Sequence, residues 1–169
     1  MNSVQLHLAL THVPVILSLV GLIMLIVGLL KKNSVVIKTS LTIIAIAGIT
    51  ALPVYFSGEE AEEAVEHIAG ISESLIEEHE EIAKYSMISI VISGLLALVT
   101  MLSAKWTGIN KHLKTAVLFT AFISAGLMVQ TAHTGGQIRH SEMNGGTVAQ
   151  NDNERNAEVN VAGKEEDDD

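Results

Sequence analysis

The sequence predicts an all-α membrane protein: a four-transmembrane-helix up-down bundle with an outer acidic helical hairpin extension and a disordered acidic tail. Four windows without Asp, Glu, Lys or Arg span residues 2–30, 39–58, 85–104 and 115–138. A helix needs roughly 20 apolar residues to cross a bilayer, and each window is long enough. Hydrophobic residues make up 49% of the chain and charged residues only 17%. This composition excludes an ordinary soluble globule, and a membrane barrel would show ~10-residue alternating segments instead.

Each apolar window is expected to form an α-helix, because backbone N–H and C=O groups cannot stay unpaired in lipid. The spans are predicted at about residues 4–30, 37–57, 85–104 and 112–135, within a membrane bundle of residues 1–140. The first window lacks a positively charged start, and its apolar run is too long for a signal peptide. It is therefore expected to remain as a helix of the bundle.

The segment between the second and third spans, residues 58–84, is strongly acidic. From residue 59 onward it carries ten glutamates and one lysine. Its less polar residues recur at alternating spacings of four and three, which indicates helices with one apolar seam. They are Ala61, Val65, Ile68, Ser72, Leu75, His79 and Ile82. Spans two and three are therefore expected to continue past the membrane and meet in an acidic hairpin, whereas residues 141–169, rich in Gly, Asn and acids, are predicted to be disordered.

The charges indicate how the bundle is oriented. Six of the ten Lys and Arg residues fall in the loops after spans one and three, and all nineteen acids fall on the other side. By the positive-inside rule the lysine side is cytoplasmic, and both termini lie outside. The net charge of −9 argues against nucleic acid as a partner.

The histidines are the candidate ligands. The chain has no cysteine, which excludes a thiolate metal site or covalent haem attachment. Six of its seven histidines fall on the predicted outer side. Measured from the middle of each span, His12 and His133 lie about 13 to 15 Å out, and His7 and His79 about 20 to 22 Å out. Ionisable groups near hydrocarbon suggest a functional site, although an interfacial histidine can also simply bind a carbonyl or water.

The helical spacing also predicts which way these side chains face. His79 lies in the apolar seam, and its stripe continues through Ser86, Ser89 and Ser93. A second inward stripe is expected to run from His133 back through Gly126, Phe122 and Phe119. Small residues beside a histidine would let a flat macrocycle or another helix approach closely.

Four short segments resemble a known family. They are QLHLALTHVP (Gln5–Pro14), YFSGEEAEE (Tyr55–Glu63), EEHEE (Glu77–Glu81) and TAHTGGQIRH (Thr131–His140). Together they resemble bacterial four-helix integral membrane proteins of a domain-of-unknown-function family, with paired histidines opening helix one and an H-x-G-G segment ending helix four. The resemblance implies a bundle in the bacterial cytoplasmic (inner) membrane that binds b-type haem. It points to five histidines: His7, His12, His79, His133 and His140.

The first functional hypothesis is a b-type cytochrome-like subunit with one or two haems held between helices. His12 and His133 would ligate a deeper haem, and His7 with His79 or His140 a shallower one. Lys84 and Arg139, at the outer interface, would pair with the haem propionates. The subunit would transfer electrons at its outer face, with a soluble or membrane-bound cytochrome or a respiratory complex as partner.

Two alternatives stay open. Imidazole and carboxylate ligands suit a metal-binding protein, and Glu78, His79 and Glu80 concentrate them at one level. However, neighbours on a helix point in different directions. The other alternative is a structural or assembly subunit whose acidic hairpin and tail contact a basic partner. No nucleophile motif accompanies the histidines, so a non-catalytic role is favoured over an enzyme.

Overall fold

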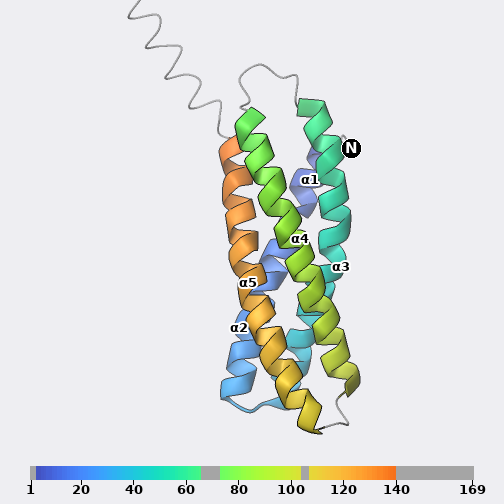
Figure 1. The fold of residues 1–169 in the computed structure, drawn as a ribbon, viewed down its shortest axis with the longest axis vertical. Helices are drawn as coiled ribbons and strands as arrows, with labels where there is room; N and C mark the ends of the chain where they lie inside the picture. The colour runs from blue at the N-terminus through green and yellow to red at the C-terminus, as the bar shows by residue number, and fades with distance from the viewer. Residues whose placement is uncertain (1–2, 66–72, 104–106, 140–169) are drawn as a thin grey trace, which may run out of the picture.

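The computed structural model describes residues 3–65, 73–103 and 107–139, with the side chains of residues 3, 6, 64, 65, 107–109 and 139 left aside. The predicted hairpin tip and the tail lie outside these residues. The elements of the described part are all helices (Figure 1). They are α1 (Ser3–Leu10), α2 (His12–Leu30), α3 (Ser34–Val65), α4 (Glu73–Leu102) and α5 (Thr107–Arg139). The predicted all-α fold is confirmed.

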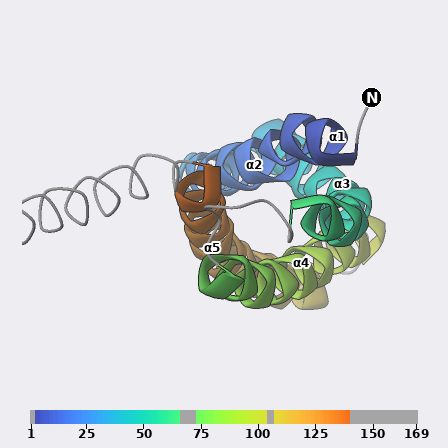
Figure 2. The same ribbon diagram turned by 90° about the horizontal axis from the view of Figure 1, so that it is seen from above.

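The four long helices form a bundle in which each packs against two neighbours. Seen along the bundle in Figure 2, α2, α3, α4 and α5 follow one another around a ring, and α5 closes it against α2. Four segments are long and apolar enough to cross a membrane. They are His7–Leu30, Ser34–Glu63, Glu73–Leu102 and Asn110–Ile138. The chain is therefore a multi-pass membrane protein by length and composition.

The first span is divided into two helices rather than one. Pro14 has no N–H, so it cannot bond to the carbonyl of Leu10 one turn earlier. The helix is interrupted at Thr11, although the Thr11 N–H still reaches the His7 carbonyl at 3.0 Å. Beyond this break α1 packs mainly on α3. The interruption thus places the residues of α1 beside the second half of α3.

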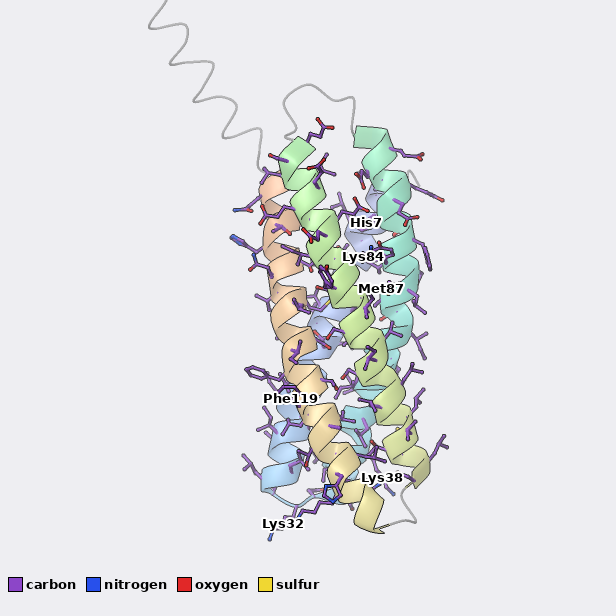
Figure 3. All side chains as sticks on the ribbon, in the orientation of Figure 1. His7, Lys32, Lys38, Lys84, Met87 and Phe119 are labelled. Atoms are coloured by element: carbon purple, nitrogen blue, oxygen red, sulfur yellow. The ribbon has the colours of Figure 1, made fainter. Side chains whose placement is uncertain are left out.

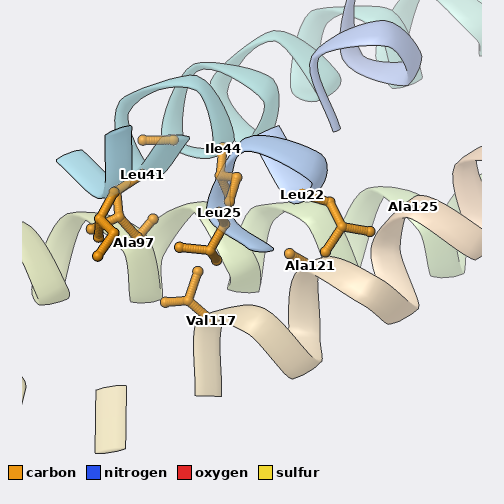
Figure 4. Close-up of a cluster of buried hydrophobic side chains, with 10 residues drawn as sticks. Leu22, Leu25, Leu41, Ile44, Ala97, Val117, Ala121 and Ala125 are labelled. Carbon is orange, nitrogen blue, oxygen red and sulfur yellow. The ribbon is translucent and has the colours of Figure 1, made fainter. Parts of the chain in front are cut away.

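Small and medium-sized residues fill the bundle interior. Figure 4 shows one cluster in which Leu25, Ile44 and Val117, from three different helices, are completely buried. The backbones of α3 and α4 lie close together at Gly48 and Gly94, where an added Cβ on either residue would lie 3.3 Å from the other's Cα. Close approach through small residues is the usual way for helices to associate in lipid.

The two ends of the bundle carry opposite charge. Lys32 and Lys38 lie at one end in Figure 3, here called the lysine end. At the other end α3 and α4 extend through Glu59–Glu63 and Glu73–Glu81, whose carboxylates are almost all exposed. This acidic end also holds the start of α1 and the end of α5 (Figure 1). Which end faces the cytoplasm stays a prediction.

Candidate cofactor site

His7 is held by α3 near the acidic end. Its Nδ1 lies 3.1 Å from the Val54 carbonyl oxygen and 3.2 Å from Ser57 Oγ. Ser57 donates its own hydroxyl hydrogen to the Val54 carbonyl at 2.8 Å, so both oxygens are acceptors toward the imidazole. The proton therefore belongs on Nδ1. This tautomer leaves the Nε2 lone pair of a half-buried ring available as a ligand.

His79 is held by α5 in the same manner. Its Nδ1 lies 2.9 Å from Thr134 Oγ1. That hydroxyl donates to its own helix, to the carbonyls of Thr131 at 3.1 Å and Gln130 at 3.3 Å, so it accepts from the imidazole. His79 is thus assigned the Nδ1–H tautomer as well, with Nε2 as the free nitrogen.

A glycine follows each of the two hydroxyl residues, and because it has no side chain it leaves room for the imidazole ring. A Cβ added at Gly58 would lie 3.1 Å from Cε1 of His7, 3.5 Å from Nδ1 and 3.9 Å from Nε2. The corresponding distances from Gly135 to His79 are 3.0, 3.5 and 3.7 Å. Both rings therefore present the same edge to a glycine, at nearly the same distances. A side chain at either position would press on the ring.

The two imidazoles lie at the acidic end of the bundle, and each is half-buried against a neighbouring helix. Among the described residues, neither Nε2 has a hydrogen-bond partner. Lys84 is exposed on α4, and Figure 3 shows it at the level of His7. The part of the chain that is described contains no group of three or more His, Cys, Asp or Glu able to hold a metal ion.

Between His79 and the lysine end, pairs of hydroxyl side chains connect α4 and α5. The predicted inward stripe is confirmed, since Ser86 and Ser93 are buried and Ser89 is half-buried. The pairs, with their oxygen–oxygen distances, are Ser86–Thr131 at 2.7 Å, Ser89–Ser124 at 2.7 Å and Ser93–Thr120 at 3.3 Å. In each pair the α5 hydroxyl also donates to a carbonyl of its own helix. Each pair is therefore a separate hydrogen-bonded contact that holds α4 against α5.

The inward stripe predicted from His133 is wrong. His133 and Gly126 are exposed, and Phe119 and Phe122 are each 67% exposed. Figure 3 shows Phe119 pointing away from the bundle. The inward face of α5 is instead made mostly of small and hydroxyl residues, together with one methionine: Val117, Ala121, Ser124, Ala125, Thr134 and Met128. Lipid is as apolar as a phenylalanine ring, so nothing drives the large rings inward, whereas small residues allow close packing.

His12 does not face the interior either. It is exposed, and its Nδ1 lies 3.1 Å from the Leu8 carbonyl of the preceding turn. The inward face of α2 begins at Pro14, and two residues along a helix correspond to a rotation of roughly 200°. The predicted internal pair of His12 and His133 is therefore not formed. His140 and the Arg139 side chain lie outside the described residues.

Three contributors to the site were not predicted from the sequence: Ser57, Gly58 and Thr134. A signal for them exists in two of the quoted segments, because a hydroxyl residue is directly followed by glycine in both Ser57–Gly58 and Thr134–Gly135. Gly135 belongs to the H-x-G-G segment that begins at His133, but the structure places it against His79. None of the family models, curated proteins or solved structures compared with the chain matches it.

Proposed function

We propose that this chain is a b-type cytochrome-like membrane subunit that binds haem at its acidic end, with His7 and His79 as the axial ligands. The observation that carries the proposal is the shared arrangement of the two rings. Each is half-buried, each has Nδ1 bound to a neighbouring helix, and each has an Nε2 without a hydrogen-bond partner among the described residues. A ligating histidine almost always donates its other ring N–H to an oxygen in this manner.

Among the described residues, the number of available ligands favours haem over a bare metal ion. A structural zinc ion takes four protein ligands and a catalytic one three, whereas a haem iron needs at most two from the protein. The pair comes from α1 and α4, and four-helix bundles place cofactor sites between facing helices in this way. Of the pairings considered, only His7 with His79 draws support from the geometry, which favours one haem.

The proposed role is electron transfer at the outer face of the bacterial cytoplasmic membrane. A bound haem supplies one reversibly oxidised iron, whose potential depends on its axial ligands and their hydrogen bonds. Lys84 offers a positive charge to a propionate at the same end. The exposed glutamates around it suit a basic redox partner, such as a soluble or membrane-bound cytochrome. Because the ligand pair sits at one end, the subunit serves that side rather than conducting across the bilayer.

The test is an oxidised-minus-reduced visible spectrum of the full chain, purified in mild detergent from haem-supplied cells, together with metal analysis. We expect the α-band of a b-type cytochrome in the wild type. His7→Ala and His79→Ala should each abolish or change the band, because each removes one axial ligand. The exposed histidines provide matched controls, so His12→Ala and His133→Ala should keep the wild-type spectrum.

Each other result would contradict the proposal in a recognisable way. A colourless protein with stoichiometric zinc, copper or iron would indicate the metal-binding alternative. A protein without haem or metal would leave the structural or assembly subunit. A b-type spectrum that disappears with His133→Ala but survives His79→Ala would mean that haem binds elsewhere on the bundle.

A further inference from the structure

The two candidate ligands are positioned by the same local arrangement of residues on different helices. His7 of α1 rests on Ser57–Gly58 of α3, and His79 of α4 rests on Thr134–Gly135. In both cases a hydroxyl oxygen accepts from Nδ1 and the next residue is a glycine beneath the Cε1 edge of the ring. The two sites share no residue, so the repetition consists of two independent observations.

We infer that Ser57–Gly58 and Thr134–Gly135 are positioning residues that hold each imidazole as the Nδ1–H tautomer and leave Nε2 as the ligating atom. This inference rests on the proposed function, because it explains the arrangement by haem ligation. The tautomer and the ring position, however, can be measured on the protein without haem. The acceptors fix the proton, because the Val54 carbonyl beside His7 can only accept and each hydroxyl has a backbone carbonyl to which it donates its own hydrogen. The glycine fixes the distance between ring and helix, because any Cβ would enter the space of Cε1.

The geometry predicts different effects for adjacent glycines on one helix. A Cβ at Gly135 would lie 3.0 Å from His79 Cε1, so the ring or the helix must move by a few tenths of an ångström. A Cβ at Gly136 would have no atom within 4 Å. Gly135→Ala and Gly136→Ala therefore change helix propensity equally, but only the first disturbs the imidazole. Gly58→Ala is the corresponding change for His7.

The first measurement uses haem-free protein in detergent micelles, labelled with ¹⁵N-histidine. Long-range ¹H–¹⁵N correlation spectra distinguish the two neutral tautomers, and His7→Gln and His79→Gln assign the signals. We expect Nδ1–H at both residues in the wild type. Gly135→Ala should shift only the His79 signals, Gly58→Ala only those of His7, and Gly136→Ala neither. An Nε2–H tautomer at either residue, or equal effects of Gly135→Ala and Gly136→Ala, would overturn the inference.

The second measurement is a haem titration of the same variants, followed by visible absorption. Disturbing the groups that orient a ligand typically costs 10- to 100-fold in affinity. We expect a loss of roughly that size for Gly135→Ala and for Gly58→Ala, and none for Gly136→Ala. If the wild type shows both Nδ1–H tautomers but takes up no haem, the proposed function fails while the positioning of the rings stands. If it takes up haem with unchanged affinity in Gly135→Ala and Gly58→Ala, the positioning role fails.

Discussion

At the scale of single residues, the facing of a polar side chain decides its role in this bundle. His79 and His133 both lie in the half of the bundle near the acidic end. His79 contacts a hydroxyl of the neighbouring helix, whereas His133 is exposed. The same distinction holds at the lysine end. Asn110 is buried and donates from Nδ2 to the Thr100 carbonyl at 2.9 Å, while His112, two residues later, is exposed.

Asn110 is expected to stabilise the end of α4. The helix ends at Leu102, so the Thr100 carbonyl belongs to the last turn, where it accepts from Asn110 Nδ2 and, at 3.2 Å, from Ser103 Oγ. Asn110→Ala removes the shorter of these two bonds, and we expect a loss of about 1 kcal/mol in the free energy of unfolding. His112→Ala, on the same helix but exposed, should have no measurable effect. Reversible denaturant unfolding in micelles compares the two, and equal stabilities would show that the Asn110 bond contributes nothing.

At the scale of elements, the positions of the helices could be predicted from the sequence. Which side of each helix faces the bundle interior could be predicted only in part. Stretches without charge show where a helix crosses lipid, because a charged residue there is costly. They do not show which face is inward, because a span is apolar on all sides. The stripe from His79 was predicted correctly since serines mark it. The stripe predicted from His133 is wrong, because Phe119 and Phe122 are exposed on the outside of the bundle. The interruption at Thr11 also escaped prediction, although Pro14 is its visible cause.

The crossing of α3 and α4 provides a test of packing at this scale. A Cβ at Gly48 would lie 3.0 Å from the Ile90 carbonyl oxygen, which is backbone and cannot turn aside. Gly48→Val should therefore separate the two helices and cost roughly 1 to 3 kcal/mol. Gly126→Val makes the same change on the exposed face of α5, where no atom lies within 4 Å of the new Cβ. Thermal unfolding in micelles should lower the Tm of the first variant only, and a similar Tm for both would contradict the close crossing.

At the scale of the whole molecule, the distribution of charge connects the fold with the proposed role. The two candidate ligands, Lys84 and the exposed glutamates of α3 and α4 share one end of the bundle. The opposite end carries Lys31, Lys32 and Lys38. An electron-transfer site near one surface serves partners on that side only. The orientation of the bundle therefore determines which compartment would supply the proposed redox partner.

The orientation can be measured directly because the chain has no cysteine, so a single introduced thiol is the only reactive one. Glu73 and Lys31 are exposed at the acidic and lysine ends. The positive-inside rule places Lys31 in the cytoplasm. A membrane-impermeant maleimide should therefore label Glu73→Cys in intact cells and label Lys31→Cys only after the cells are opened. The reverse pattern would turn the proposed haem ligands toward the cytoplasm, and the proposed partner would have to be sought there, with the candidate site itself unchanged.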